Sequence, residues 1–451
     1  MTDIATPQKP FVVVLGGIES GVGAALLAQK QQYSVFVSDK GTIPIAYKQV
    51  LKQHGIRFEE NQHDENLILT ADIVVKSPGI PEKAPIIQQI RAKGITLVSE
   101  IEFAARHTTV PIIAITGSNG KTTTTSLTYH LLEQAGLSVQ LGGNIGESFA
   151  KLVATQPPPS YYVLEVSSFQ LDDIQTFAPH IAMITNITPD HLDRYNYRFE
   201  EYVVAKFRIA AHQKNTDHLI LGIDNPAIQE HLQQNLHFSE AQQYRFSIED
   251  DASVAFGTVE SMTVLGKKIS LQQFPLSGKH NRYNALCAAL VARILGIDAA
   301  TIEKGLNSFE ALENRLEPVA TRNDVLYIND SKATNIDSAW YALDGMTRPI
   351  VWIAGGTDKG NDYGLLYELV QQKVRAIVCM CVDSSKIKAA FSPLGIPIVD
   401  ALSATEAVQQ SQQLAQKGDV VLLSPACASF DLFQNYVDRG NKFRESVLAL
   451  T

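Results

Sequence analysis

The chain has 451 residues, of which 45% are hydrophobic and 19% charged, with a formal net charge of −9. This length favours two to four domains, and the composition is that of a soluble globular protein with sizeable cores. The negative charge provides no basic field, which argues against nucleic acid or an anionic membrane as a partner. No apolar run reaches the roughly 18 residues of a membrane span. The opening stretch MTDIATPQKP lacks a signal-peptide core, so we expect a cytoplasmic protein.

The four cysteines are too few for a disulfide framework. Cys379 and Cys381 are separated by one residue, unlike the C-x-x-C pattern of zinc and redox sites. They lie in the apolar run AIVCMCV, so we expect them in a buried strand.

Short β-branched runs alternate with longer amphipathic stretches from the N-terminus onward. FVVVLGG (11–17), SVFVSD (34–39) and ADIVVKSPG (71–79) have the pattern of buried parallel strands that end in glycine- or serine-rich loops. Helical stretches such as AALLAQKQQ lie between them. This alternation is typical of β-α-β units and predicts a doubly wound sheet.

The same alternation starts again twice. PIIAITGSNGKT (111–122) opens a second series, with strands predicted near YYVLEVSS (161–168) and HIAMITNIT (180–188). A third series follows ENRLEPVATRNDVLYINDSKATN and continues through PIVWIAGGTDKG, AIVCMCV and DVVLLSPACAS. We therefore predict an α/β protein of three domains, with boundaries that give residues 1–102, 103–311 and 312–451.

A glycine-rich stretch, LGGIESGVGAA, follows the first predicted strand and leads into a helix, and Asp39 ends the next strand. This is a Rossmann-like layout, in which glycines allow close backbone approach and the acid can bind a ribose hydroxyl. The dinucleotide pattern G-x-G-x-x-G fails because Ile18 stands between Gly16 and Gly21. Two interpretations remain open. Either this loop binds a nucleotide or diphosphate, or its glycines serve only the packing of the helix on the strand.

The stretch TGSNGKTT lies between a predicted strand and a predicted helix, which is the context of a phosphate loop. Its backbone N–H groups can form an anion nest, Lys121 can offset charge on the β- and γ-phosphates, and the Thr122 hydroxyl can bind Mg²⁺. Ile115 replaces the usual leading glycine, which implies a shorter loop. The alternative is a turn without function. The predicted ATP-binding loop comprises Gly117, Ser118, Asn119, Gly120, Lys121, Thr122 and Thr123.

Three residues further along have chemistry that suits such a loop. Glu165 ends a predicted strand and could bind Mg²⁺. His191 follows a proline turn at the start of a predicted helix, where either a site role or a capping role is open. Lys206 lies on an amphipathic helix, and this pattern alone favours a solvated lysine in a salt bridge.

The stretch SGKHNRYNALCAAL predicts a helix with Asn281 and Asn284 on one face near its N-terminal end. Asparagine both donates and accepts hydrogen bonds, which suits an adenine edge or a phosphate–metal cluster. Helix capping is the alternative, and it explains one asparagine more easily than two.

Taken together, these stretches resemble the Mur ligase family of peptidoglycan synthesis. The resemblance covers essentially the whole chain and rests on these motifs: TGSNGKTT, GGNIG, LEVSSFQL, NITPDHLDR, AKFRI, GKHNRYNA, ENRLE and NDSKATN. Within the family, NDSKATN and LLSPACASFDLFQNYVDRG are similar to the members that add D-glutamate. The D-N-P-R motif of the diaminopimelate- or lysine-adding members is absent, and folylpolyglutamate synthases lack the N-terminal domain.

The resemblance implies a Rossmann-like N-terminal domain for a UDP-linked substrate, a central P-loop ATPase domain, and a Rossmann-like C-terminal domain for the amino acid. The implied UDP-substrate residues are Gly16, Ser20, Gly21, Asp39, Lys40, Ser77, Pro78, Gly79 and Asn144, with Ile80 close by. Outside the phosphate loop, the implied ATP residues are Asn281, Asn284, Arg315, Asp330 and Lys332. The implied D-glutamate residues are Thr334, Lys359, Ser429 and Tyr436.

The same resemblance implies the catalytic residues, which are Lys121, Asn144, His191 and Lys206. It implies two Mg²⁺ ions, with Thr122, Glu165, His191 and Lys206 as the metal-binding residues. Lys206 matches the lysine that the family carries as a carbamate, whose two anionic oxygens can bind Mg²⁺ where an ammonium cannot.

Three positions depart from the family pattern. Asn314 precedes Arg315 where histidine is frequent, and Tyr436 stands where phenylalanine is common. The uracil-side arginine of some members is not evident, so Lys40 or a backbone group would substitute for it.

The implied reaction joins D-glutamate to UDP-N-acetylmuramoyl-L-alanine through an acyl phosphate, with release of ADP and phosphate. The expected partners are these small molecules and ATP, without nucleic acid or membrane insertion, and the expected state is a monomer. Two alternatives are another Mur-type ligase with a different acceptor or amino acid, and a P-loop nucleotide switch without ligase chemistry.

Overall fold

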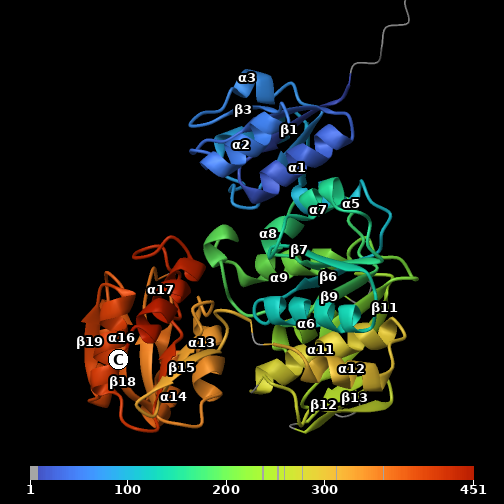
Figure 1. Cartoon of the computed structure of the whole chain (residues 1–451). Coiled ribbons are helices and arrows are strands. Elements are labelled where there is room, and N and C mark those ends of the chain that lie inside the picture. Colours follow the sequence, from blue (N-terminus) through green and yellow to red (C-terminus); the bar gives the residue numbers. More distant parts are fainter. Residues whose placement is uncertain are drawn as a thin grey trace, which may run out of the picture. The chain divides into compact units, whose positions relative to one another are not determined.

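The structure is a computed structural model that describes residues 9–235, 238–250, 253–258, 260–276, 278–310, 312–358 and 360–450. The chain forms two compact units. The first extends to Leu271 and includes Tyr283–Leu306, and the second comprises Gln272–Arg282 and the chain from Asn307 onward. Three separate sheets follow one another along the sequence, two in the first unit and one in the second (Figure 1).

The first sheet has the strand order β3-β2-β1-β4-β5, and all its pairings are parallel. Its strands are β1 (Phe11–Leu15), β2 (Ser34–Ser38), β3 (Arg57–Glu59), β4 (Ile73–Lys76) and β5 (Thr96–Ser99). The helices between them are α1 (Glu19–Lys30), α2 (Ile45–Gln53), α3 (Glu65–Ile68) and α4 (Pro85–Ala92). The chain winds in opposite directions from β1, so the loops after β1 and β4 flank a topological switch point, where α/β sheets bind ligands.

Helix α1 packs closely on α7 (Phe149–Thr155), which belongs to the second sheet's layers. Gly23 lies at this contact, and a Cβ there would be 1.9 Å from the Ser148 Oγ. A side chain at Gly23 would push the helices apart. Across this contact, one hydrophobic core continues from the first sheet to the second.

The second sheet has nine strands in the order β14-β13-β12-β11-β10-β9-β6-β8-β7. Its parallel part comprises β6 (Ile112–Thr116), β7 (Val139–Gly143), β8 (Tyr161–Glu165), β9 (Ile181–Ile184), β10 (His218–Gly222), β11 (Gln242–Ser247) and β12 (Ala255–Gly257). The antiparallel strands β13 (Ser261–Val264) and β14 (Lys267–Ser270) extend one edge. The remaining helices of this region are α5 (Glu100–Ala105), α6 (Lys121–Gln134), α8 (Ser168–Leu171), α9 (Phe199–Phe207), α10 (Pro226–Gln234), α11 (Lys279–Ile294) and α12 (Ala299–Asn307).

The third sheet has the order β15-β16-β20-β17-β18-β19, and only β15 pairs antiparallel. Its strands are β15 (Glu317–Arg322), β16 (Val325–Asn329), β17 (Ile350–Ala354), β18 (Val374–Met380), β19 (Ile398–Ala401) and β20 (Val420–Leu423). The helices beside it are α13 (Ile336–Asp344), α14 (Tyr367–Lys373), α15 (Ser385–Phe391), α16 (Ala404–Leu414) and α17 (Tyr436–Leu448).

These three sheets confirm the predicted α/β class, with one Rossmann-like or P-loop sheet in each of three successive parts of the chain. Each strand that the sequence analysis named is present, and Cys379 and Cys381 are buried as expected. The antiparallel strands β13–β14 and β15 were not predicted. The sheets change between Ser99 and Ile112 and again between Ser270 and Glu317, while the domain boundaries themselves stay predictions.

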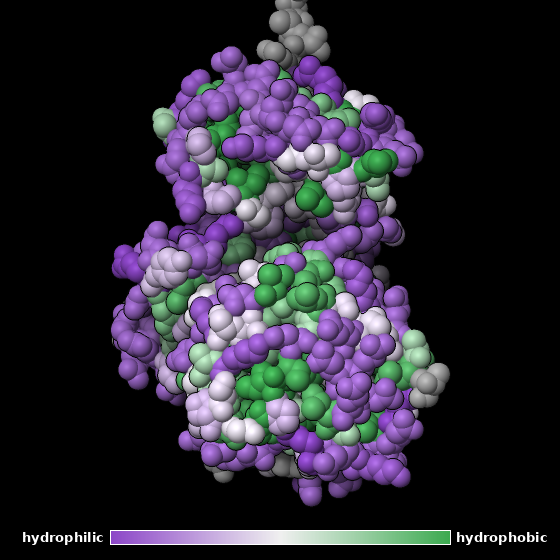
Figure 2. Space-filling view, turned by 90° about the vertical axis from the view of Figure 1, so that its left-hand side faces the viewer, coloured by the Kyte–Doolittle hydropathy of each residue, from purple (hydrophilic) through white to green (hydrophobic). Residues whose placement is uncertain are grey.

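No helix among the described residues is long and apolar enough to cross a membrane. Hydrophilic side chains cover much of the face shown in Figure 2, and hydrophobic residues there form separate patches.

Glu100, in the connection from the first sheet to the second, is fully buried. Burial raises its pKa from 4.5 to about 7, against the opposing effect of the Ala150 N–H, which donates to its carboxylate. Between these two pH values the unfolded chain binds fewer protons at this site than the folded chain. This group therefore lowers the free energy of unfolding as pH rises from about 4.5 to 7.

We expect Glu100→Gln to remove this part of the pH dependence. Urea unfolding at pH 5 and pH 8 measures it: the wild type should lose more stability than the variant over that interval. Equal losses in both proteins would show that the Glu100 carboxyl is ionised in the fold at pH 5.

Candidate active site

The phosphate loop follows β6, and α6 begins at Lys121. Gly117 and Gly120 have φ of 153° and 78°, conformations that favour glycine. At Gly120 a Cβ would be 2.4 Å from the Asn284 Oδ1 of α11. The Lys121 ammonium donates to the Gly117 and Ser118 carbonyls, both at 2.8 Å, so it folds back over the loop. The loop is thus a glycine-dependent turn that presents a helix N-terminus and a cation.

Glu165, at the end of β8, accepts hydrogen bonds from two predicted site residues. The Thr122 Oγ1 donates to one carboxylate oxygen at 2.6 Å, and the Asn144 Nδ2 donates to the other at 2.7 Å. The carboxyl ends of the parallel strands β6, β7 and β8 meet at one edge of the sheet, which explains why these three residues converge. A carboxylate and a hydroxyl are oxygen ligands that suit Mg²⁺, whose remaining positions are commonly water and phosphate oxygens.

A second loop, after β9, supports the phosphate loop, and the sequence analysis missed this role. The Asn186 Oδ1 accepts from the Asn119 N–H at 2.9 Å, and its Nδ2 donates to the Asn119 carbonyl at 2.9 Å. The Thr188 N–H donates to the Ser118 Oγ, which in turn donates to the Thr188 carbonyl. The available signal was the polar stretch TNIT (185–188), which directly follows a predicted strand of the same series as the phosphate loop.

Lys206 lies on α9 and is 1% exposed, so the solvated lysine favoured by the helical pattern is wrong. Its ammonium donates to the Gly117 carbonyl at 2.7 Å and lies 4.5 Å from the centre of the Tyr202 ring. Burial, followed by repulsion from Lys121, lowers the Lys206 pKa well below the usual value for lysine. A buried lysine with a lowered pKa has the neutral amine that carbamate formation requires.

His191 precedes a short 3₁₀ turn, Leu192–Arg194, instead of the α-helix expected from the sequence. Its φ is 53°, its N–H donates to the Asp190 Oδ1 at 2.8 Å, and its ring meets Phe169 edge-on. His191 follows β9 at the same edge of the sheet as the phosphate loop.

Asn284 lies in the second turn of α11, so it does not cap this helix. Its side-chain oxygen accepts from the Thr124 Oγ1 at 3.1 Å, behind the phosphate loop. Asn281 is also buried on α11.

In the first sheet, the glycine loop after β1 lies against the loop after β4. A Cβ on Gly16 would be 2.5 Å from the Ser77 Oγ, and a Cβ on Gly21 would be 1.8 Å from the Gly16 carbonyl oxygen. The Ser20 and Ser77 hydroxyls are 3.3 Å apart. The glycines therefore serve close packing, and the two loops together form one candidate ligand surface.

The Asp39 carboxylate accepts from the Gly17 and Gly41 N–H groups at 2.7 and 2.8 Å. It thus orders the glycine loop, and Lys40 beside it is exposed. Pro78 and Gly79 lie in the loop after β4.

In the second unit, the loops at the carboxyl ends of the adjacent strands β16 and β20 carry four of the described predicted residues, namely Asp330, Lys332, Thr334 and Ser429. Tyr436 begins α17, and Arg315 precedes β15. Asp330 is buried and accepts from the Ser424 Oγ at 2.8 Å and the Leu316 N–H at 3.2 Å. Burial raises its pKa from 3.8 to about 7. The Leu316 bond ties Asp330 to the segment that carries Arg315.

Lys332 and Tyr436 are in contact, because the lysine ammonium lies 3.9 Å from the centre of the tyrosine ring. Ser331 joins the same loops: its hydroxyl donates to the Tyr436 carbonyl at 2.8 Å and accepts from the buried Arg439 at 3.0 Å. The sequence analysis assigned no role to Arg439, although this residue lies in VDRG at the end of the motif LLSPACASFDLFQNYVDRG. Ser429 is buried, Thr334 is partly buried, and Lys359 lies outside the described residues.

Asn314, the residue found where the family often has histidine, is 3% exposed with φ of 61°. Its Oδ1 accepts from the Asn329 Nδ2 at 2.9 Å and would be 1.7 Å from a Cβ on Gly440. Its carbonyl accepts from the Lys332 N–H at 3.1 Å. Asn314 is therefore a buried residue whose hydrogen bonds connect its own loop to the end of β16 and to the loop after β16.

The sheet order, the loop after β6 and the carboxylate that faces its threonine define a P-loop protein of the α/β class. The family is defined as well, because models of the Mur ligase middle domain and the Mur ligase glutamate ligase domain match residues 115–292 and 314–427. A model of the MurD N-terminal domain matches residues 20–86. This chain belongs to the Mur ligase family.

Curated relatives match along almost the whole chain. Proteins named UDP-N-acetylmuramoylalanine--D-glutamate ligase from Christiangramia forsetii and Bacteroides fragilis are 50% and 47% identical to it. Each alignment covers 97% of this chain, and 98% and 99% of the respective relative. The protein of the same name from Porphyromonas gingivalis strain W83 is 48% identical over 98% of this chain and 99% of its own length.

Solved structures share the fold at low sequence identity. A pseudomurein peptide ligase type C from Methanothermus fervidus has a TM-score of 0.62 at 19% identity, covering 98% of this chain and 100% of that protein. The MurC ligase of Thermotoga maritima has the same TM-score at 18% identity, covering 98% of this chain and 99% of that protein. These likenesses support the three-domain Mur ligase architecture.

Proposed function

We propose that this chain is an ATP-dependent ligase that adds D-glutamate to UDP-N-acetylmuramoyl-L-alanine in peptidoglycan precursor synthesis. The observation that carries this proposal is the 50% identity to a ligase of that name over 97% of the chain. The convergence of Thr122, Asn144 and Glu165 beside the phosphate loop supports a phosphoryl-transfer site in the same chain. It acts in the cytoplasm as a monomer, with small-molecule partners and neither nucleic acid nor membrane insertion.

The reaction has two steps. An oxygen of the L-alanyl carboxylate attacks the γ-phosphorus of ATP, the bond from that phosphorus to the bridging oxygen breaks, and ADP leaves. The D-glutamate amine then attacks the acyl carbon, loses a proton, and inorganic phosphate leaves as the C–O bond breaks. Activation is needed because oxide is not a usable leaving group, whereas phosphate is.

The chain's residues bind and orient these groups instead of forming covalent bonds. Loop N–H groups and Lys121 neutralise charge on the transferring phosphoryl group. Asn144 and His191 orient the reacting carboxylate. The rest of the ATP site comprises Asn281, Asn284, Arg315, Asp330 and Lys332.

The other two substrates bind in the outer domains. Gly16, Ser20, Gly21, Asp39, Lys40 and the Ser77–Gly79 loop bind the UDP part. Thr334, Lys359, Ser429 and Tyr436 bind D-glutamate, with the Tyr436 hydroxyl available to water or substrate.

Thr122 and Glu165 would hold one Mg²⁺, and His191 with a carbamylated Lys206 would hold a second. Bound Mg²⁺ neutralises phosphate charge and fixes the phosphates in place. The donor set fits, because it offers a hydroxyl, a carboxylate and, after carbamylation, two further anionic oxygens. The burial and lowered pKa of Lys206 favour the neutral amine that reacts with CO₂.

ADP release tests the proposal directly. The purified chain is assayed with ATP, Mg²⁺ and UDP-N-acetylmuramoyl-L-alanine, together with D-glutamate, L-lysine or diaminopimelate. We expect turnover that requires the UDP substrate and is fastest with D-glutamate. Faster turnover with another amino acid would identify a different Mur-type ligase, and hydrolysis without the UDP substrate would identify a nucleotide switch.

A further inference from the structure

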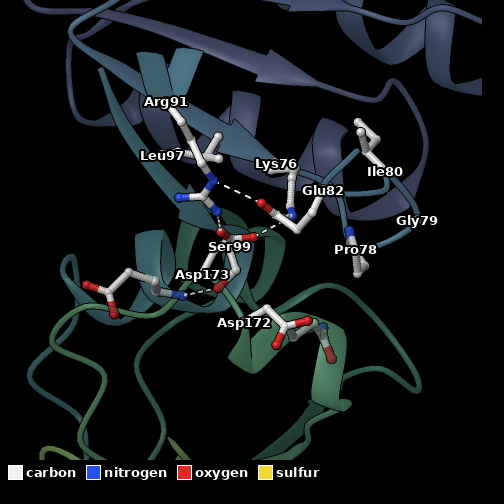
Figure 3. A network of polar contacts seen from close by, with 12 residues as sticks. Lys76, Pro78, Gly79, Ile80, Glu82, Arg91, Leu97, Ser99, Asp172 and Asp173 are labelled. Carbon is white, nitrogen blue, oxygen red and sulfur yellow. Dashed lines mark hydrogen bonds and ion pairs between the residues drawn. The ribbon is translucent and has the colours of Figure 1, made fainter. Parts of the chain in front are cut away.

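Two polar contacts connect the loop after β4 to the segments after α8 and β9 in the first unit. The first is an ion-pair cluster seen in Figure 3, centred on Lys76 and Asp173, whose side chains are 3% and 1% exposed. The Lys76 ammonium lies 2.6 Å from the Asp173 Oδ2, and the Asp173 backbone carbonyl accepts from the Ser99 N–H at 2.9 Å. Lys76 immediately precedes the Ser77–Ile80 loop.

Two more charges complete this cluster. Arg91 of α4 donates to the Asp173 Oδ1 at 2.7 Å and to Glu82 at 2.9 Å, and Glu82 also accepts from Lys76. Burial raises the pKa of Glu82, but hydrogen bonds from Arg91 and Lys76 outweigh it and hold the pKa below its usual value. The cluster has two positive and two negative groups, so the buried Lys76–Asp173 pair is compensated. A compensated pair fixes geometry more than it adds stability.

The second contact is Arg194, in the 3₁₀ turn that begins after His191. Its guanidinium donates to the carbonyls of Pro78 at 3.0 Å and Gly79 at 3.2 Å, and one nitrogen lies 3.5 Å from the Ile80 carbonyl. The guanidinium carbon is 4.4 Å from the centre of the Phe169 ring, which fixes its plane. A planar group with several donors suits a set of converging carbonyls, whereas lysine offers only a point charge.

These two contacts hold the loop on both sides. Lys76 fixes its start through Asp173, and Arg194 binds the carbonyls of its last three residues. The Arg194 N–H also donates to the His191 carbonyl at 3.0 Å, so one turn carries both the catalytic histidine and the residue that holds the loop. The loop orientation and the position of His191 are thus mechanically linked.

From this geometry we infer that Arg194 and Asp173 are positioning residues for the UDP-linked substrate. They act through the Ser77–Ile80 loop and set where the substrate's carboxylate lies relative to His191. This inference rests on the proposed function, because it needs that loop to bind the UDP substrate. Neither residue is required to touch the substrate.

Arg194→Gln tests the inference, with Arg198→Gln as the matched control. Arg198 is in the same segment and pairs with Glu201 at the surface, where it is 66% exposed. We expect Arg194→Gln to raise KM for the UDP substrate about tenfold, the order expected from losing charged hydrogen bonds. KM for ATP should stay within about twofold, because the phosphate loop is untouched.

Binding measured without turnover separates positioning from catalysis. Calorimetric titration with the UDP substrate alone should show about tenfold weaker binding by Arg194→Gln and unchanged binding by Arg198→Gln. Arg194→Lys should recover only part of the affinity, because an ammonium cannot reach the three carbonyls as a planar fork does. Asp173→Asn should act in the same direction; it leaves Lys76 facing a neutral amide, so its melting temperature is measured alongside.

The outcomes are distinguishable from failure of the proposed function. If the wild-type chain makes no product with the UDP substrate and D-glutamate, the function itself fails. If the wild type is active and a folded Arg194→Gln behaves like Arg198→Gln, the positioning role is overturned. An equal rise in KM for both substrates would also overturn it, since that result indicates a general structural loss.

Discussion

Lys121→Ala is expected to abolish ATP-dependent product formation, with kcat lowered by at least about 100-fold, the usual loss when one preorganised charge-stabilising donor is removed. In the structure the ammonium donates to the Gly117 and Ser118 carbonyls at 2.8 Å. It is therefore already held above the loop where the phosphates would lie. Moving from these carbonyls to phosphate oxygens would need only side-chain rotation.

The control for this prediction is Lys214→Ala, which removes an exposed lysine of the same region. Its kcat should match the wild type. Thermal melting of both variants shows whether the fold is kept, because Lys121 also holds two loop carbonyls. Near-normal product formation by a folded Lys121→Ala would refute the assignment of this loop as the ATP site.

Much of the fold was predictable because the parallel strands are continuous β-branched runs that end in recognisable loops. The phosphate loop illustrates this: TGSNGKTT has its glycines at the two positions with left-handed or extended positive φ. Glu165 was also predictable as a residue that ends a strand, whereas Asn144 was named only from the family resemblance. Since parallel strands share one carboxyl edge, such residues converge without any long-range information.

The sequence could not predict properties that depend on packing from distant segments. Lys206 has the pattern of a surface lysine. Its burial results from packing against the phosphate loop, where its ammonium donates to the Gly117 carbonyl. Asn314 was named only as a departure from a family pattern. In the structure its buried side chain accepts a hydrogen bond from Asn329 and packs against Gly440, which has no side chain. The Lys76–Asp173 pair joins residues 97 positions apart, for which no local pattern exists.

Lys206→Ala is expected to lose most of its activity and to regain part of it when a small carboxylic acid such as acetate is added. The reason is that Lys206 is 1% exposed and its pKa is lowered by burial, so its neutral amine is suited to carry a carbamate. The alanine variant leaves a space in which an added carboxylate can supply the missing anionic oxygens. The measurement is the initial rate of ADP release at increasing acetate concentration.

Lys121→Ala provides the matched control for this rescue. This variant lacks the Lys121 ammonium, a positive group that the negatively charged acetate cannot replace. Acetate should leave its rate unchanged, and it should not accelerate the wild type.

Lys121 and Lys206 lie close together, since both donate to the Gly117 carbonyl. Their predicted roles nevertheless differ in charge: Lys121 acts as a cation, and Lys206 carries an anionic carbamate. Two ammonium groups at one carbonyl repel each other, and this repulsion also lowers the pKa of Lys206. Carbamylation would replace that repulsion by attraction between Lys121 and an anion. A folded Lys206→Ala that shows no rescue at any acetate concentration would count against the carbamate.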